Sequence, residues 1–233
     1  MERDLAIKVL HQHLCSDTNA IERFLDESRS LKELHHQNIA AVYDCGILPS
    51  KQPYIVEEYV AGESLQQIIR SGHQFSGQEF KSIFASVLTG LFHAHSKQII
   101  HRDIKPANIM IGDLSAEPPQ VKLLDFGIAK LGGEQNSPSL TATGQLLGTP
   151  LYMSPEQCSG DELDARSDLY STGCVMYETI TGRRPFDGEN AFVCMLKHLN
   201  EEAAPLAGDG ISSEYSDLID RAMAKQPAQR FSS

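Results

Sequence analysis

The sequence predicts an α+β fold with a strand-rich N-terminal part and a mainly helical C-terminal part. Before Gly62, short runs of branched apolar residues are bounded by polar or turn residues, which is typical of strands. After Gly62, longer segments place apolar residues at i, i+3, i+4 and i+7, which is typical of helices. A chain of 233 residues, 41% of them hydrophobic, can bury a core as one domain or two tightly joined lobes.

The first 60 residues combine strands with one helix. Strands are predicted at 5–10, 41–47 and 54–60, and the apolar spacing predicts a helix over 18–34. Glu27 falls on the apolar face of that helix. Because an unpaired buried charge is expensive, we expect Glu27 to have a charged partner elsewhere in the chain.

The remainder is predicted to be mainly helical around a few short strands. The longest apolar face runs over 80–95 and predicts a central helix, followed by strands at 109–111 and 121–124. Residues 130–150 are rich in Gly, Ser, Thr and Pro and predict a long loop, and loops of this length are usually functional or disordered. Further helices are predicted at 166–181, 191–200 and 213–225.

Composition narrows the classes of function. Lys and Arg number 20 against 31 Asp and Glu, and the net charge of −11 argues against nucleic acid or anionic lipid as a main partner. Five Cys without a C-x-x-C pair indicate free thiols in a reducing compartment. No apolar stretch approaches the ~18 residues of a membrane span, so we expect a soluble, cytoplasmic chain without a membrane segment.

Two motifs carry the chemistry. Residues 101–108 read His-Arg-Asp-Ile-Lys-Pro-Ala-Asn, the form H-R-D-x-K-x-x-N, and Asp125-Phe126-Gly127 follows 22 residues after Asp103. With average residue usage, the first motif alone arises by chance in roughly one in 10⁴ chains of this length. Here the chain resembles the eukaryotic-like protein kinases, and the K-x-x-N form resembles their serine/threonine branch. The likeness to bacterial members is strongest over 147–157.

Further segments extend the resemblance over nearly the whole chain. Ala6-Ile7-Lys8 looks like the family's V-A-I-K strand, with Glu27 as the partner of Lys8 on the helix called αC, and Glu58-Tyr59-Val60 resembles the hinge. Gly148-Thr149-Pro150 and Ser154-Pro155-Glu156 resemble the end of an activation segment.

Two single residues match structural positions of the family. Asp168 resembles the buried helix residue that braces the catalytic loop, and Arg230 resembles the arginine that pairs with the glutamate of the A-P-E motif, here Glu156.

The resemblance implies a bilobal protein-kinase fold. An incomplete N-terminal lobe would span residues 1–60 and a mainly helical lobe residues 61–233 of a single kinase domain. Only seven residues precede Lys8, too few for the family's glycine-rich loop, and three follow Arg230. We therefore expect a kinase domain that is truncated at both ends and lacks that loop.

The resemblance also implies an enzyme that transfers the γ-phosphate of ATP to Ser or Thr hydroxyls of protein substrates. Asp103 would accept or orient the substrate hydroxyl, Lys105 would offset charge on the phosphoryl group, and Lys8, oriented by Glu27, would hold the α- and β-phosphates. Mg²⁺ (or Mn²⁺) would bind Asn108 and Asp125, whose oxygens suit a hard cation. The adenine contacts would come from Ala6, Met110 and the hinge residues Glu58 and Val60.

Regulation through the activation loop is implied as well. In similar bacterial kinases the threonines six and eight residues before the Thr149 equivalent are autophosphorylated, and here these are Thr143 and Thr141. A phosphate there would make charge-assisted bonds to Arg102 and order the loop. Self-association would serve autophosphorylation between two copies of the chain.

Glu57 departs from the family pattern. Alignment of 54–60 on the hinge puts Glu57 at the gatekeeper, which is normally apolar or Thr. Glu57 either competes with Glu27 for Lys8, in which case Glu57→Met should raise ATP affinity, or marks an alignment slip of one residue. A second function stays open: a non-catalytic kinase-like module that binds partners, because phosphates without a covering loop would be poorly shielded from water.

Overall fold

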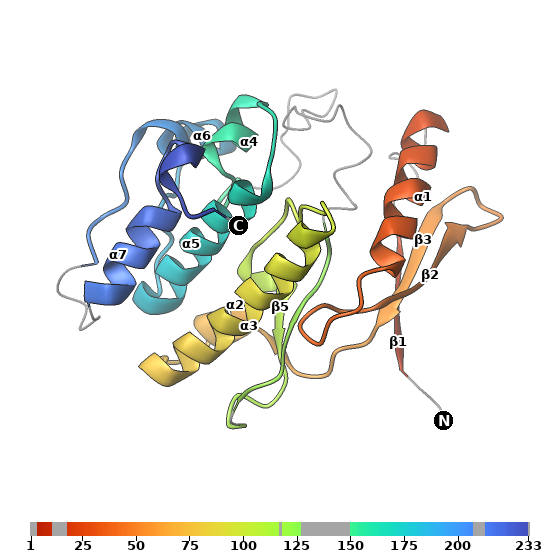
Figure 1. The fold of residues 1–233 in the computed structure, drawn as a ribbon, viewed down its shortest axis with the longest axis horizontal. Helices are drawn as coiled ribbons and strands as arrows, with labels where there is room; N and C mark the ends of the chain where they lie inside the picture. Colours follow the sequence, from red (N-terminus) through yellow and green to blue (C-terminus); the bar gives the residue numbers. More distant parts are fainter. Residues whose placement is uncertain (1–3, 11–17, 117, 127–149, 207–212, 233) are drawn as a thin grey trace.

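A computed structural model describes residues 4–10, 18–116, 118–126, 150–206 and 213–232. Within these ranges a small sheet and one helix form one side of the molecule, and a group of helices forms the other (Figure 1). A second, shorter sheet lies among the elements of the helical side.

The first sheet holds Lys8 and Glu57 on one face. Strands β1 (Leu5–Val9), β2 (Val42–Ile47) and β3 (Pro53–Glu58) are antiparallel in the order β1-β3-β2. In the register, Ala6 lies opposite Glu57 and Lys8 lies opposite Ile55. Because side chains alternate between the faces of a sheet, Lys8 and Glu57 are diagonal neighbours on the same face.

Helix α1 (Thr18–Lys32) packs against β2 and β3. Its residues Phe24 and Leu31 are buried, and Leu34 just beyond its end is buried too. The apolar spacing of the sequence therefore does mark the face of α1 that enters the core.

The second sheet positions the motif residues. Strands β4 (Glu63–Ser64), β5 (Ile109–Ile111) and β6 (Val121–Leu123) are antiparallel in the order β4-β5-β6. A short 3₁₀ turn, η2 (Pro106–Asn108), leads into β5. The backbone N–H of Leu124 donates to the carbonyl of Asn108 at 2.9 Å, so the segment after β6 is fixed beside η2.

The helices form the larger part of the core. A capping box at Ser76 and Glu79 starts the long helix α3, and Asp164 caps the N-terminus of α5. Helix α5 is buried over most of its length and contacts α3 and α7. The helical elements are α2 (Leu65–Arg70), α3 (Gly77–Ser96), α4 (Pro155–Ser159), α5 (Ala165–Thr181), α6 (Ala191–Asn200), α7 (Ser213–Ala222) and the 3₁₀ turn η4 (Pro227–Gln229).

Backbone hydrogen bonds join the segment before β2, in the first sheet, to β6, which precedes the Asp125-Phe126-Gly127 motif. The N–H of Ala40 donates to the carbonyl of Leu123 at 2.9 Å, and the N–H of Leu123 donates to the carbonyl of Asn38 at 2.8 Å. The side chain of Asn38 donates to the carbonyl of Val121 at 2.9 Å. The segment that enters β2 is thus anchored to β6, two residues before Asp125.

The predicted α+β fold is confirmed, and each predicted strand and helix is present with ends shifted by a few residues. The short elements β4, α2 and α4 were not predicted, since segments of two to six residues carry no readable periodicity. Most of the loop predicted at 130–150 lies outside the described residues. None of the helices described here is long and apolar enough to cross a membrane.

Candidate active site

A hydrogen-bonded loop joins the three polar residues of the H-R-D-x-K-x-x-N motif. Lys105 Nζ donates to Asp103 Oδ2 at 2.7 Å. Asn108 Nδ2 donates to the carbonyl of Asp103 at 2.8 Å and to its Oδ2 at 3.1 Å. These contacts fix the carboxylate of Asp103 between a cation and an amide.

Asp168 on α5 forms hydrogen bonds with the backbone of this loop. Its carboxylate accepts the N–H groups of His101 at 2.8 Å and Arg102 at 2.9 Å, and its Oδ2 lies 2.8 Å from His95 Nε2. Asp168 is 1% exposed. Arg102 has φ of 65°, which a non-glycine residue rarely adopts, and the bond to Asp168 helps to hold it there.

The ammonium of Lys8 contacts two carboxylates, those of Glu57 and Asp125. Burial alone would lower the pKa of Lys8, but Asp125 and Glu57 outweigh it and raise that pKa. Asp125 has φ of 56°, in the left-handed region that Asp tolerates better than most residues. Lys8 and Asp125 therefore come together from the two sides of the molecule.

The expected ion pair between Lys8 and Glu27 is replaced by another arrangement. Glu27 Oε1 lies 3.7 Å from Arg102 Nη1, and the side chain of Glu27 is 45% exposed. Partial burial raises the pKa of Glu27, against the opposing effect of Arg102 and Arg23. Lys8 instead has the carboxylates of Glu57 and Asp125 as its partners, so its charge is compensated without Glu27.

Glu57 is the residue that the alignment left open. It is 4% exposed and its side chain faces Lys8. Burial raises the pKa of Glu57, although the hydrogen bond and charge of Lys8 act in the opposite direction. The strand register places Glu57 opposite Ala6, so contact with Lys8 follows from the sheet itself.

The residues expected around adenine lie on β1, β3 and β5, except Val60, which follows two residues after the end of β3. Ala6, Val60 and Met110 are all half-buried. Glu58 ends β3, and its Oε2 accepts hydrogen bonds from Lys122 Nζ at 2.8 Å and from the backbone N–H of Ala41 at 3.2 Å. This link to the nearly buried Lys122 was not predicted, although a lysine inside an apolar strand signals a buried partner.

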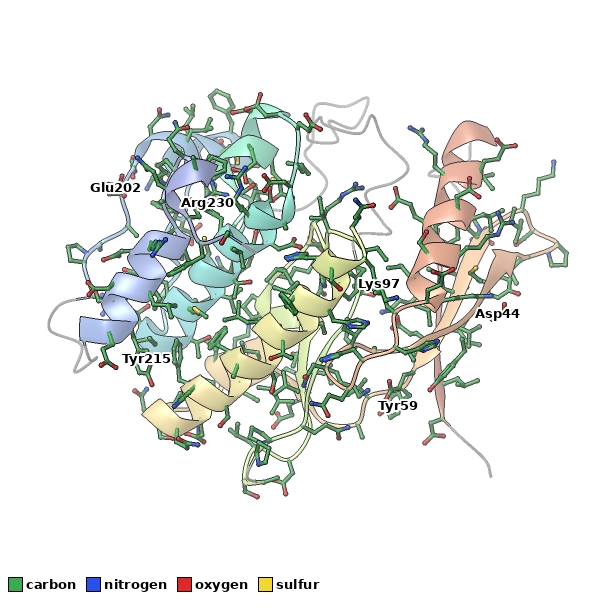
Figure 2. All side chains as sticks on the ribbon, viewed as in Figure 1. Asp44, Tyr59, Lys97, Glu202, Tyr215 and Arg230 are labelled. Atoms are coloured by element: carbon green, nitrogen blue, oxygen red, sulfur yellow. The ribbon has the colours of Figure 1, made fainter. Side chains whose placement is uncertain are left out.

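Glu156 and Arg230 form the expected ion pair. The guanidinium donates to both carboxylate oxygens, at 2.7 and 2.8 Å, and Ser167 Oγ donates to Glu156 Oε1 at 2.7 Å. Burial would raise the pKa of Glu156, but Arg230 and Ser167 outweigh it and lower that pKa. Arg230 lies among the C-terminal helical elements (Figure 2), where the pair joins α4 to the chain after η4.

Three positions that the resemblance assigns to the activation segment belong to a range that the structure does not describe. Thr141, Thr143 and Thr149 all lie outside the described residues, as does Gly127. The ring of Phe126, the last described residue before that range, lies 4.4 Å from the ring of His101 on the catalytic loop.

Asn108 and Asp125 fit a hard divalent cation. The hydrogen bond between Leu124 N–H and the carbonyl of Asn108 places them on adjoining segments. The amide nitrogen of Asn108 is committed to Asp103, so its amide oxygen is the atom suited to a cation. Carboxylate and amide oxygens are the ligands that Mg²⁺ prefers in proteins.

Two residues near the catalytic loop were missed by sequence reasoning. His95 lies on α3, and its Nε2 contacts Asp168 Oδ2. Gln157 Nε2 donates to the carbonyl of Arg102 at 2.9 Å and so ties α4 to the loop. The only sequence signal for Gln157 is its place directly after the S-P-E motif.

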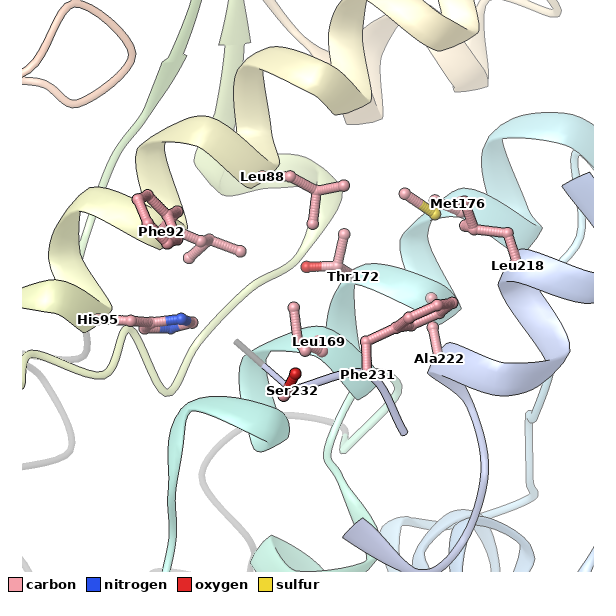
Figure 3. A pocket seen from close by; sticks show the side chains of 12 residues that line it. Leu88, Phe92, His95, Leu169, Thr172, Met176, Leu218, Ala222, Phe231 and Ser232 are labelled. Atoms are coloured by element: carbon pink, nitrogen blue, oxygen red, sulfur yellow. The ribbon is translucent and has the colours of Figure 1, made fainter. Parts of the chain in front are cut away.

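An apolar cavity of about 300 Å³ lies away from this constellation, between α3, α5 and α7 (Figure 3). Leu88, Phe92 and Met176 line it, with Phe231 from the end of the chain. Its lining carries almost no group suited to phosphate. The polar residues that suit a phosphate-bearing ligand are instead those around Lys8 and Asp103.

Comparison with known proteins assigns the family. The family described as "Protein kinase domain" matches residues 1–233, and the chain belongs to it. The chain is 40% identical to the serine/threonine-protein kinase PknB of Mycobacterium leprae over 99% of its length, and 40% identical to the serine/threonine-protein kinase pkn3 of Myxococcus xanthus over 99%. It spans only 37% and 43% of those two proteins.

A solved bacterial kinase domain has a similar fold. A crystal structure of the PknI kinase domain of Mycobacterium tuberculosis superposes with a TM-score of 0.73 at 26% sequence identity, covering 98% of this chain and 80% of that one. The chain is therefore a protein kinase domain of the bacterial serine/threonine type.

Proposed function

We propose that this chain transfers the γ-phosphate of ATP to Ser or Thr hydroxyls of protein substrates. One observation carries the proposal. Asp103, Lys105 and Asn108 form one hydrogen-bonded loop, while Lys8 contacts Asp125 from across the molecule. These contacts support the proposal that a hydroxyl-orienting carboxylate and a phosphate-binding lysine act in one site.

Each side chain has a role that its chemistry supports. Asp103 orients the attacking hydroxyl and accepts its proton, and Lys105 offsets charge on the group in transfer. Lys8 binds the α- and β-phosphates. Asn108 and Asp125 would hold Mg²⁺ (or Mn²⁺), which would neutralise charge on the phosphates. Ala6, Met110 and the backbone of Glu58 and Val60 line the adenine site.

Transfer of labelled phosphate from ATP to a generic protein substrate tests this proposal. The wild-type chain should label Ser and Thr in the presence of Mg²⁺, and Asp103→Asn should label at least 10²-fold more slowly, the usual loss for a group that handles the proton. Equal labelling by both proteins would contradict the proposal. Bound ATP without transfer would instead favour the kinase-like interaction module.

We also propose activation by phosphorylation of Thr141 and Thr143. Arg102, beside Asp103 and within 3.7 Å of Glu27, supplies a guanidinium that suits a phosphate. Transfer between two self-associating copies would supply the modification. Mass spectrometry of active protein should find phosphate on at least one of these threonines, and active protein with neither modified would refute the idea.

A further inference from the structure

We propose that Glu57 is an autoinhibitory residue, whose carboxylate competes with the phosphates of a nucleotide for the ammonium of Lys8. This rests on the proposed function, because Lys8 is the residue assigned there to the α- and β-phosphates. Glu27 keeps the role that the resemblance implies for it, as the partner of Lys8 once Lys8 has left Glu57.

The register of the first sheet holds the competing carboxylate beside Lys8. In the antiparallel pairing of β1 with β3, Lys8 lies opposite Ile55, two residues before Glu57. Lys8 and Glu57 are therefore diagonal neighbours on one face, and their charged groups are in contact. Glu27 instead contacts Arg102, with 3.7 Å between Oε1 and Nη1, and has to leave that partner before it pairs with Lys8.

Burial makes the contact between Lys8 and Glu57 costly to break. Glu57 is 4% exposed, so water cannot replace the ammonium as the partner of its carboxylate. Burial raises the pKa of Glu57, and Lys8 acts in the opposite direction through its hydrogen bond and its charge. The side chain of Glu27, by contrast, is 45% exposed. Glu57 therefore opposes the departure of Lys8 far more than a half-exposed carboxylate would.

The charges around Lys8 oppose the binding of phosphates. The ammonium lies between two carboxylates, those of Glu57 and Asp125. A divalent cation on Asp125 would offset one of these charges, whereas Lys8 is the cation that the described residues bring to Glu57. A phosphate that takes Lys8 leaves a buried negative charge at Glu57 and adds its own charge beside it. Loss of the Glu57 charge removes this opposition.

The affinities for two ligands test the competition. Glu57→Gln keeps the shape of the side chain and removes its charge, so it should strengthen the affinity for Mg·ATP about tenfold, the effect of one charge-assisted contact that no longer has to be broken. The affinity for adenosine, which has no phosphate, should stay unchanged. Glu57→Met should give the same gain for Mg·ATP. The matched control is Glu33→Gln, which changes an exposed carboxylate past the end of α1 and should alter neither affinity.

Double-mutant cycles on thermal unfolding test the competition without any nucleotide. Lys8→Met and Glu57→Gln should change the melting temperature non-additively, because they remove the same contact. Lys8→Met and Glu27→Gln should be additive in the wild-type background. In the Glu57→Gln background the same two changes should become non-additive, because Lys8 is then released to pair with Glu27.

Several results would overturn the proposal. One is unchanged or weaker binding of Mg·ATP by Glu57→Gln. Another is an equal gain for ATP and adenosine, which would show a change in the adenine site instead of competition for Lys8. Additive effects of Lys8→Met and Glu57→Gln would show that the two side chains do not interact. If the wild-type chain and both Glu57 variants bind neither ligand, the proposed function fails, and the unfolding cycles alone decide whether Glu57 keeps Lys8 from Glu27.

Discussion

At the scale of single residues, buried charges determine the shape of the site. Asp168 accepts three hydrogen bonds from the catalytic loop and α3, and Glu156 binds Arg230 through both oxygens. Both carboxylates are almost inaccessible to water. Such groups cost most when a partner is removed, because the remaining donor or charge stays buried.

Asp168→Asn should destabilise the chain and loosen the catalytic loop. Because Asn is neutral, both the His101 and the Arg102 N–H groups lose a charged acceptor, and one of them faces the NH2 donor of the amide. We expect a loss of about 2–3 kcal/mol in the free energy of unfolding. Urea denaturation measures this loss, and a midpoint equal to that of the wild type would contradict the bracing role.

Glu156→Gln should cost about 3–5 kcal/mol at neutral pH, since it leaves Arg230 buried without a counter-charge. The pKa of Glu156 is lowered in the folded chain, so its contribution is present above the ordinary value of about 4.5 and is lost as the pH falls through the folded-state pKa. The stability difference between variant and wild type should therefore shrink below about pH 4.

Denaturation at several pH values measures that difference. The exposed pair of Asp26 and Arg29 provides the control, and Asp26→Asn should cost less than about 1 kcal/mol. A difference for Glu156→Gln that stays constant from pH 7 to pH 3 would show that the ion pair is not its cause.

At the scale of elements, the stability of the chain depends on how closely helices α5 and α7 pack. Helix α5 crosses α7 where Gly173 faces Ala222 and Met223, and a Cβ on Gly173 would lie 2.8 Å from Met223 Cγ and 3.0 Å from Ala222 Cβ. Glycine at this position therefore sets how closely the two helices approach.

Gly173→Ala should destabilise the chain by about 1–3 kcal/mol, because overpacking outweighs the better helix propensity of Ala. Gly77→Ala is the matched control, since a Cβ there would meet nothing nearer than Tyr215 Oη at 3.9 Å. Thermal unfolding should show a lower melting temperature for the first variant only. A melting temperature unchanged by Gly173→Ala would contradict the close approach.

At the scale of the whole molecule, sequence predicted the architecture but not every long-range contact. The motifs fixed the order of the functional residues, and periodicity located the longer elements such as α3 and α5. Spacing could not decide which carboxylate reaches Lys8, because the position of α1 depends on packing that no local pattern encodes. Cross-strand register would have favoured Glu57, had the pairing of β1 with β3 been known.

The central claim concerns the whole molecule: residues from both of its sides are proposed to form one nucleotide site. Lys8 comes from the first sheet, whereas Asp103, Asn108 and Asp125 come from the segments around the second sheet. A ligand that binds only the folded site stabilises the chain by about 2.7 kcal/mol at 100 times its Kd.

The most direct measurement is therefore the melting temperature with and without Mg·ATP, for the wild type, Lys8→Met and Asp125→Asn. For a chain of this size the stabilisation corresponds to roughly 5–10 °C. We predict that shift for the wild type and a much smaller one for both variants. No shift for the wild type, or equal shifts for all three proteins, would contradict a nucleotide site built from Lys8 and Asp125.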